Sequence, residues 1–330
     1  MTLIDAVYIN NGGGKILLEY LITELENYDI DVTYLLDERY TGILPKNNKI
    51  LRLKPSLYKR HIFYLRNKNT FNKILCFGNI PPTVKMNSTV FTYFHQFLFL
   101  INPNINKPKF WVLIHLKKII IKYFKKYSNF WITQNQYVSD KLSNFLNCNV
   151  NNILIIPFFR SLKITNSSIK RKKQFLYVSN GEPHKNHLNL IIAFKQFYDK
   201  YQTSELHLTI PENYKSILSN LSVKYPIINH ECLNDNELVN LYCESEFFIF
   251  PSKFESFGLG IVEAIECGCK VIGSDLPFLH QICKPTFVFN QDSVSSIFNA
   301  LEYSYFSETK LSQLNVTNDI KQLINILKSE

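Results

Sequence analysis

The sequence predicts an α/β protein with two domains, each built around a parallel sheet, and three observations support this. The chain has 330 residues, which is long for a single hydrophobic core. Hydrophobic residues make up 46% and charged residues 19%, so we expect packed structure along the chain except at its C-terminal tail. Short apolar strands alternate with helical segments, and this alternation starts again near the middle of the chain.

The first half opens with a strand, a glycine-rich turn, a helix and a second strand, a pattern that implies a parallel sheet. These four segments are predicted at Ile4–Ile9, Asn10–Gly14, Lys15–Glu26 and Ile30–Leu36. Further strands are predicted at Lys73–Phe77, Thr89–Tyr93, Phe130–Thr133 and Ile153–Ile156, and a helix at Val138–Leu146.

A polar and basic stretch without periodicity, Ser161–Lys173, separates the two halves, and we place the domain boundary there. The predicted domains are therefore 1–165 and 166–315, followed by an amphipathic helix within 316–330. Strands of the second half are predicted at Phe175–Ser179, Glu205–Ile210, Phe247–Phe250 and Lys270–Gly273, and helices at Leu188–Lys200, Tyr214–Lys224, Asn236–Cys243 and Gly260–Glu266. Two such halves would leave a cleft where ligands bind.

The formal net charge of +10 favours anionic partners such as nucleic acid, anionic lipid or phosphorylated small molecules. Seven cysteines without a CxxC pair indicate neither a disulfide framework nor a metal site, and they fit a reducing compartment. The N-terminus lacks the pattern of a secretion signal, and no apolar run reaches the roughly 18 residues of a spanning helix. We therefore expect a cytoplasmic protein.

The most informative segment is Phe247–Ala264, in which a buried strand runs through a loop into a helix. Gly258 and Gly260 let the backbone approach a ligand closely, and the N–H groups of Leu259, Gly260 and Ile261 would point outward at the start of the helix. Such a helix start binds a diphosphate well, because its N–H groups and its dipole both favour negative charge. Two carboxylates, Glu255 and Glu263, stand eight positions apart and could accept hydrogen bonds from sugar or ribose hydroxyls.

This segment resembles the E-x7-E signature of the retaining group 1, or family 4, glycosyltransferases. The stretch Cys267–Pro277 is similar to a second motif of that family. The resemblance implies that Glu255 contacts the transferred sugar, that Glu263 binds the ribose, and that the backbone at Phe257, Gly258, Leu259 and Gly260 holds the diphosphate. The alternative is an ordinary strand, loop and helix with two solvated glutamates.

Phe175–His187 resembles the strand and loop that open the donor domain in this family. The resemblance implies that Lys185 neutralises the leaving diphosphate. Asn180 occupies the position of the family's usual arginine, so one cation of the expected pair is missing. We interpret this as a variant site, with Asn180 still beside the donor. The histidines of the loop, His184 and His187, are expected to pack or to lie on the surface.

Two features of the first half match the family less specifically. The resemblance implies that His95, at the end of a strand, faces the donor sugar, although a single histidine is often structural. It also implies that the glycine-rich turn, through Gly13 and Gly14, lies close to the donor phosphate. These glycines could equally form a simple turn, and their spacing fits neither a P-loop nor a dinucleotide fingerprint.

Residues 107–126 hold seven lysines, no acidic residue and many apolar residues. On a helical wheel Lys118, Lys122, Lys125 and Lys126 share one side, and Val112, Leu116, Ile119, Ile120 and Tyr123 the other. Such a helix could lie on an anionic membrane as a peripheral contact. It could equally be a helix whose apolar side is its core face.

Taken together, the resemblance implies a GT-B fold, in which two Rossmann-like domains face each other across a cleft and the C-terminal helix crosses back to the first domain. It implies a retaining hexosyltransferase that moves a hexose from a nucleoside diphosphate sugar to a glycan or lipid-linked glycan, in bacterial surface polysaccharide synthesis. No cofactor besides this co-substrate is expected. No metal is expected either, because the Asp29-Ile30-Asp31 triplet begins a strand away from the expected cleft.

Two other classes of function remain open at this stage. A non-enzymatic basic protein that binds nucleic acid or membrane would explain the net charge but not the glutamates and glycines, so we do not expect nucleic acid as a partner. Another GT-B enzyme, such as a sugar-nucleotide epimerase, would share the motifs. A dinucleotide oxidoreductase is disfavoured because no glycine fingerprint precedes a suitably placed acidic residue.

Overall fold

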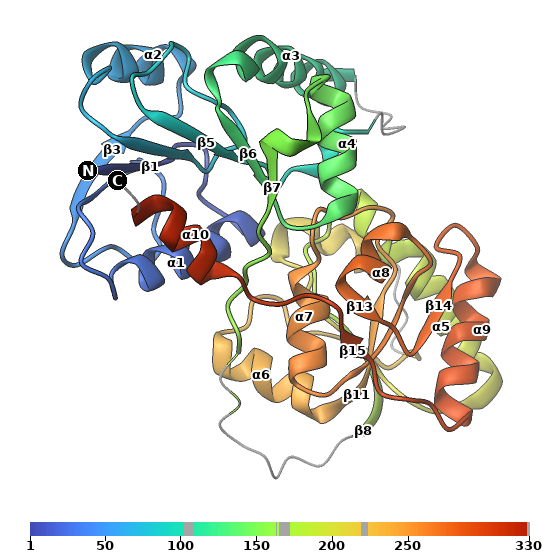
Figure 1. Ribbon diagram of the computed structural model, residues 1–330. Coiled ribbons are helices and arrows are strands. Elements are labelled where there is room, and N and C mark those ends of the chain that lie inside the picture. The colour runs from blue at the N-terminus through green and yellow to red at the C-terminus, as the bar shows by residue number, and fades with distance from the viewer. Residues whose placement is uncertain (102–107, 163, 165–171, 219–223, 329–330) are drawn as a thin grey trace. The chain divides into compact units, whose positions relative to one another are not determined.

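The computed structural model describes residues 1–101, 108–162, 164, 172–218 and 224–328 (Figure 1). The chain forms two compact units. Met1–Arg160 and Thr317–Glu330 make up the N-terminal unit, and Ser161–Val316 make up the C-terminal unit. Each unit holds a parallel sheet flanked by helices, which confirms the predicted α/β class with two Rossmann-like parts. The predicted boundary between residues 165 and 166 lies outside the described residues.

The sheet of the N-terminal unit has seven strands in the order β3-β2-β1-β4-β5-β6-β7, and all neighbouring strands are parallel. Its central strands are buried on both faces, which is why they read as continuous apolar runs. The strands are β1 Thr2–Ala6, β2 Val32–Asp37, β3 Lys49–Leu53, β4 Lys73–Cys76, β5 Thr89–Tyr93, β6 Phe130–Thr133 and β7 Ile153–Ile155.

The helices of this unit cover both faces of the sheet (Figure 1). Right-handed crossovers place α2, α3 and α4 on one face and α1 on the other, where α10 packs beside it. The bounds are α1 Gly12–Leu25, α2 Leu57–Arg66, α3 Pro108–Phe124, α4 Gln136–Leu146 and α10 Ile320–Lys328, with 3₁₀ turns at Phe97–Phe99, Lys125–Tyr127 and Val150–Asn152. Over the described residues, no helix has the length and apolarity needed to cross a membrane.

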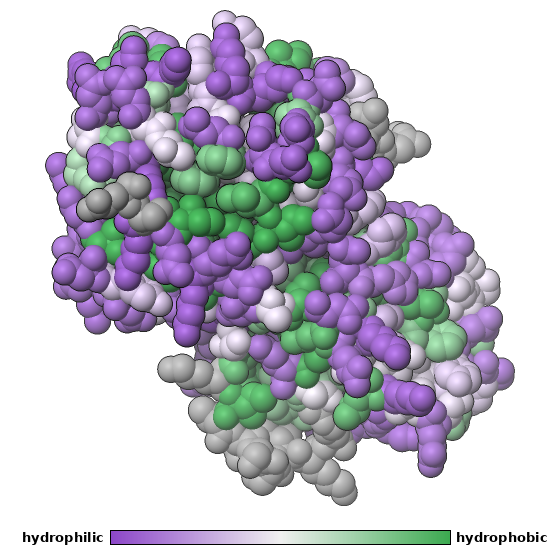
Figure 2. Space-filling model, viewed as in Figure 1, coloured by the Kyte–Doolittle hydropathy of each residue, from purple (hydrophilic) through white to green (hydrophobic). Residues whose placement is uncertain are grey.

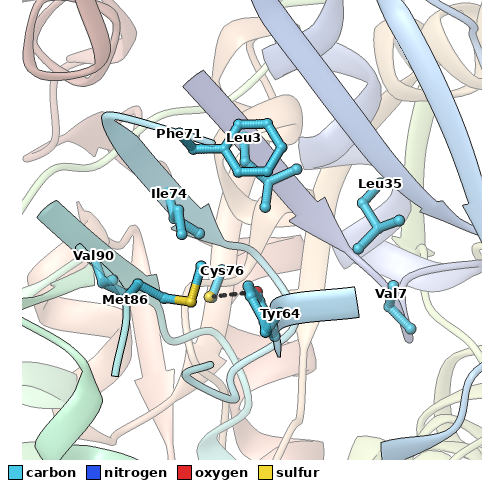
Figure 3. Packing of buried hydrophobic residues seen from close by; sticks show 9 residues of the cluster. All are labelled: Leu3, Val7, Leu35, Tyr64, Phe71, Ile74, Cys76, Met86 and Val90. Atoms are coloured by element: carbon cyan, nitrogen blue, oxygen red, sulfur yellow. Dashed lines mark hydrogen bonds between the residues drawn. The ribbon is translucent and has the colours of Figure 1, made fainter. Parts of the chain in front are cut away.

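One part of the N-terminal core lies between the sheet and α2 (Figure 3). Beside it, the buried guanidinium of Arg60 donates to Asp5 Oδ2 at 2.7 Å and to the carbonyls of Ile80 and Pro81 at 2.7 and 2.8 Å. This network ties the segment after β4 to the core. The core residues in Figure 3 are Leu3, Val7, Leu35, Tyr64, Phe71, Ile74, Cys76, Met86 and Val90.

The sheet of the C-terminal unit has the order β10-β9-β8-β11-β12-β14, again parallel throughout, and a small antiparallel pair, β13-β15, accompanies it. The strand order reverses between β8 and β11. In open parallel sheets, ligands bind outside the carboxyl ends of the strands at this reversal. The strands are β8 Lys172–Tyr177, β9 Leu206–Leu208, β10 Ile227–Asn229, β11 Ser245–Phe250, β12 Lys270–Ser274, β13 Cys283–Lys284, β14 Phe287–Phe289 and β15 Gln313–Leu314.

The helices of the C-terminal unit follow its strands, as the alternating pattern predicts. Helix α6 begins with a capping box, in which Asn234 and Glu237 satisfy each other's backbone N–H groups. The helices are α5 His187–Tyr201, α6 Asp235–Glu244, α7 Leu259–Glu266, α8 Pro277–Ile282 and α9 Val294–Phe306, with 3₁₀ turns at Pro183–Lys185 and Glu212–Leu218.

Three local predictions differ from the structure. Gly12–Gly14 form the first turn of α1 instead of a free turn, and β1 ends at Ala6, so Ile9 lies in the connection to α1. The helix predicted at Tyr214–Lys224 is a 3₁₀ helix as far as Leu218, and residues 219–223 lie outside the described residues. The edge strand β3 was not predicted. Its residues are half-buried or exposed, so basic residues interrupt its apolar ones and the sequence shows no continuous apolar run.

Candidate functional site

The candidate site of the C-terminal unit lies where the strand order reverses between β8 and β11. The loop after β8 carries Asn180 and Lys185, and the loop after β11 carries Glu255 and leads into α7. Residues that are about 70 positions apart in the sequence therefore meet at one edge of the sheet.

Lys185 and Glu255 form an ion pair, with 2.6 Å between Lys185 Nζ and Glu255 Oε1. Their side chains are only 15% and 11% exposed. The ammonium group also lies 6.0 Å from the centre of the Phe250 ring. The two side chains predicted to act on the diphosphate and on the sugar thus converge on one point, where low exposure strengthens their electrostatic interactions.

Backbone and side-chain contacts hold the two loops together. Tyr177 Oη donates to the carbonyl of Lys185 at 2.9 Å, and the N–H of Lys253 donates to the carbonyl of His184 at 2.8 Å. The His184 ring stacks on Phe254 with 4.5 Å between centroids. These contacts fix the position of the Lys185 backbone.

Asn186 connects the loop that carries Lys185 to two other loops of the unit. It adopts a left-handed conformation, with φ of +62°, which asparagine tolerates better than most residues. Its side-chain amide donates to the carbonyls of Pro251 and Gln291 at 3.2 and 2.7 Å. Gln291 also lines a hollow of about 530 Å³ at the carboxyl ends of β12 and β14. Because Asn186 bonds to Gln291, this hollow borders the loop that carries Lys185.

The two histidines of the loop are neutral at pH 7. Burial lowers the pKa of His184 to about 4, although the nearby Glu255 carboxylate opposes this, and the Lys185 ammonium adds to the lowering. Burial lowers the pKa of His187 to about 3, and its Nε2 lies 3.2 Å from Ser179 Oγ. Both rings pack against aromatic neighbours, Phe254 and Tyr177 respectively.

Sequence reasoning missed Glu182, a second carboxylate near the Lys185–Glu255 ion pair. Burial raises the pKa of Glu182, which the Lys185 ammonium opposes and the Glu255 charge reinforces. Its position three residues before Lys185 was the only available signal. Asn180, which stands in place of the family's arginine, accepts a hydrogen bond from the Glu182 N–H at 3.2 Å and so shapes this turn.

The start of α7 fulfils the prediction of a helix terminus after the Glu255 loop, with one correction. Gly258 precedes the helix with φ of +88°, a conformation that favours glycine. The Ile261 N–H, predicted to point outward, instead donates to the Gly258 carbonyl at 2.9 Å. Leu259 and Gly260 are the first two helical residues, whose N–H groups have no intrahelical partner in any α-helix.

Gly260 and Phe257 face the protein interior. A Cβ added at Gly260 would lie 3.3 Å from Phe248 Cζ and 3.5 Å from Tyr242 Oη. Phe257 is buried, with 3% exposed. The glycine at position 260 therefore serves close packing of α7 on β11 and α6.

Glu263 lies in the middle of α7 and is buried, with 7% exposed. Tyr242 Oη of α6 donates to Glu263 Oε2 at 3.0 Å. Burial, reinforced by the Glu263 charge, raises the pKa of Tyr242 well above its usual range, so the hydroxyl stays a donor. The structure therefore orients the Glu263 carboxylate through a tyrosine that the sequence motif does not contain.

In the N-terminal unit, the structure brings His95 and the glycine-rich segment together. A Cβ added at Gly14 would lie 3.1 Å from His95 Nε2, so any larger residue here would press against the imidazole. Gly13, one residue earlier, is exposed. Asn79, with φ of +66°, accepts the His95 N–H at 2.8 Å, and burial lowers the pKa of His95 to about 4. The histidine is therefore neutral at pH 7.

The Asp29-Ile30-Asp31 triplet lies at the amino end of β2, with both carboxylates exposed. This is the edge of the sheet opposite to the carboxyl ends of the strands. Within the described ranges, no group of three or more His, Cys, Asp or Glu side chains is arranged to hold a metal ion.

Comparison with known proteins agrees with the fold and with the family that the motifs resemble. Residues 160–311 match the family model described as "Glycosyl transferases group 1". The two α/β units have the GT-B fold of the glycosyltransferases to which the chain is structurally similar. The matched residues span nearly the whole C-terminal unit, whose motifs predict the same family, and the relatives that match this chain are mannosyltransferases by name.

Two relatives are mannosyltransferases by name. The O-antigen chain mannosyltransferase RfbU of Salmonella typhimurium is 23% identical over 253 residues, which cover 73% of this chain and 68% of the relative. The serotype-specific mannosyltransferase WbdA of Escherichia coli is 29% identical over 143 residues, but these cover only 40% of this chain and 17% of the relative.

Solved structures share the fold. The lipopolysaccharide outer core galactosyltransferase WaaB in its apo form has a TM-score of 0.65 at 16% identity, covering 99% of this chain and 95% of its own. HepE of Anabaena, solved in complex with UDP and glucose, has a TM-score of 0.67 at 13% identity, covering 93% and 90%.

Proposed function

We propose that this protein is a glycosyltransferase, which transfers a hexose, with mannose as the first candidate, from a nucleoside diphosphate sugar to a glycan or lipid-linked glycan of a bacterial surface polysaccharide. Mannose is favoured because RfbU and WbdA are mannosyltransferases by name. We place the reaction on the cytoplasmic side of the membrane, with retention of anomeric configuration and without a metal or a further cofactor.

The observation that carries this proposal is the ion pair of Lys185 and Glu255 next to the start of α7. We infer that the donor diphosphate takes the place of Glu255 as the partner of the Lys185 ammonium. The carboxylate of Glu255 is then released to accept hydrogen bonds from hydroxyls of the sugar. Donor binding therefore exchanges one partner of each charge for another, instead of burying an unpaired charge.

The leaving group develops negative charge as the bond between the anomeric carbon and the diphosphate oxygen breaks. We assign the stabilisation of that charge to Lys185 and to the N–H groups of Leu259 and Gly260, which would contact the diphosphate from the moment the donor is bound and would need no further reorganisation during the reaction. The acceptor oxygen bonds to the anomeric carbon on the face that the diphosphate leaves, and its proton passes to the departing diphosphate. Glu263, held by Tyr242, would bind the ribose.

A donor screen tests this function directly. The chain is incubated with GDP-mannose, UDP-glucose, UDP-galactose or ADP-glucose, and the rise in melting temperature is measured, because a ligand of the native state stabilises it. We expect GDP-mannose to give the largest rise, and the anomeric configuration of a transferred sugar to match that of the donor. Transfer that stops on removal of divalent metal by EDTA would refute the metal-independent mechanism, and the absence of any response to all four donors would refute the site.

A further inference from the structure

The positive charge of the chain is concentrated in one segment. Residues 39–139 hold 18 of the 37 lysines and arginines and none of the 27 aspartates and glutamates. The rest of the chain therefore has 19 basic and 27 acidic residues and is net negative. Residues 39–139, which we call the basic segment, therefore carry a formal charge of +18, and the rest of the chain lowers the net charge to +10.

The basic segment includes both α2 and α3, which lie on the same face of the N-terminal sheet (Figure 1). Helix α2 exposes Lys59 and Arg66, and helix α3 exposes Lys117 and Lys122, followed by exposed Lys126 in the adjoining 3₁₀ turn. Because the segment contains no carboxylate, these cations face no acidic side chain from their own helices or from β4, β5 and β6.

Helix α3 presents apolar side chains to solvent. Val112, Leu116, Ile119 and Tyr123, which repeat at helical spacing, are 56%, 51%, 57% and 64% exposed. We call these four residues the apolar strip. The sequence left open whether this side is the core face, and the structure shows that it is not.

A different side of α3 packs against the unit. Ile114 and Ile121 are buried, with 7% and 0% exposed. The Lys118 ammonium donates to the carbonyl of Ile101 at 2.6 Å, so it also faces inward. Figure 2 shows hydrophobic residues between hydrophilic ones along the edge of the unit where α2 and α3 lie in Figure 1.

We propose that the apolar strip of α3, together with the basic residues of α2 and α3, is a surface on which the protein lies against an anionic membrane leaflet. The lysines would be attracted by anionic headgroups, and the apolar strip would enter the boundary between headgroups and acyl chains. The aromatic residues Trp111 and Tyr123, 41% and 64% exposed, are of the type enriched at this boundary.

A membrane accounts for the strip better than a nucleic acid does. Phosphates of a nucleic acid would satisfy the lysines equally well. Aliphatic side chains such as Val112, Leu116 and Ile119 gain nothing from phosphates and would stay in water, whereas acyl chains would bury them. This surface would determine where in the cell the protein works, and the inference does not depend on the proposed sugar transfer.

Vesicle binding of the full chain, without donor or acceptor, tests the proposal. We expect sedimentation with vesicles of phosphatidylglycerol and phosphatidylcholine, weakening as salt rises. Each basic residue at an anionic leaflet contributes about 1 kcal/mol, or about fivefold. The double variant Lys117→Gln/Lys126→Gln should therefore bind roughly 25-fold more weakly, and Leu116→Ser/Ile119→Ser should also lose binding.

Matched controls lie in the C-terminal unit. Lys284 and Lys310 are exposed lysines, and Leu188 and Ile192 are exposed apolar residues of α5 at helical spacing. Their Gln and Ser variants should bind vesicles as the unchanged protein does. Circular dichroism and the melting temperature establish that each variant is folded.

Three results would overturn the proposal. The first is no binding of the folded, unchanged chain to anionic vesicles. The second is equal losses from the control variants. The third is tighter binding to an arbitrary DNA duplex than to vesicles, with the same dependence on Lys117 and Lys126. None of these results bears on sugar transfer, which the donor screen measures separately.

Discussion

Replacing Lys185 by alanine probes the ion pair on which the proposed chemistry depends. A lysine and a phosphate charge about 4 Å apart interact by about 4 kcal/mol at an effective dielectric constant near 20, before desolvation. In the free protein, however, the ammonium is already bonded to Glu255 at 2.6 Å. Because Lys185 exchanges one partner for another, its net contribution to the free energy of donor binding is smaller than about 4 kcal/mol.

The lysine should contribute mainly in the transition state, where the leaving diphosphate gains charge. Loss of one fixed donor to a developing anion typically costs a factor of roughly 10²–10³ in kcat, equivalent to about 3–4 kcal/mol. We expect Lys185→Ala to reduce kcat by this factor and to change KM for the donor less. Steady-state assays of sugar transfer at saturating acceptor measure both constants.

Lys253 provides the control for this experiment. It lies on the neighbouring loop and pairs with Asp292 at 2.7 Å, with 42% of its side chain exposed. Lys253→Ala removes the same charge and a similar side chain, so it should leave kcat within about threefold, because exposed ion pairs contribute little. A folded Lys185→Ala variant with the kcat of Lys253→Ala would refute the assignment of Lys185 to the leaving group.

Three further predictions follow from the same unit. Glu263→Gln should raise KM for the donor about tenfold, while Tyr242→Phe should raise it less; an unchanged KM in Glu263→Gln would contradict ribose binding. Gly258→Ala should lower the free energy of unfolding by about 1–2 kcal/mol, measured by urea denaturation, because its φ is +88°. Burial lowers the pKa of His187 to about 3, so the folded chain resists protonation of this ring. Its contribution to the free energy of unfolding is therefore complete above pH 6.5 and is lost as the pH falls toward 3. At pH 4.5 the free energy of unfolding should be lower by about 2–3 kcal/mol, and a His187→Gln variant should lack this loss.

The positions of the main strands could be predicted because parallel sheets buried on both faces leave apolar runs in the sequence. Strand β11 and the loop that follows it are the clearest example, since Phe247–Phe250 is apolar and Gly258 ends the loop. By contrast, β3 has no apolar run, and the glycines at 12–14 are weak helix formers that tertiary structure nonetheless holds in α1. Local patterns are informative only where local preference and burial agree.

Within the candidate site, the sequence determined the chemical groups, and the tertiary structure decided their partners. The motifs point to Lys185, Glu255 and Glu263, but a motif match says nothing of Tyr242, which holds Glu263 from another helix. Likewise, the sequence suggested that Gly260 lets a ligand approach the backbone. In the folded chain the missing side chain instead allows α7 to pack closely on Phe248.

The apolar side of α3 illustrates the same division. From the sequence alone, Val112, Leu116, Ile119 and Tyr123 suit a core face and a membrane face equally, because both require one apolar side. Only the folded chain decides, since it buries Ile114 and Ile121 and leaves the other side exposed. A sequence records which residues share a side of a helix, whereas contacts between distant segments determine which side meets the core.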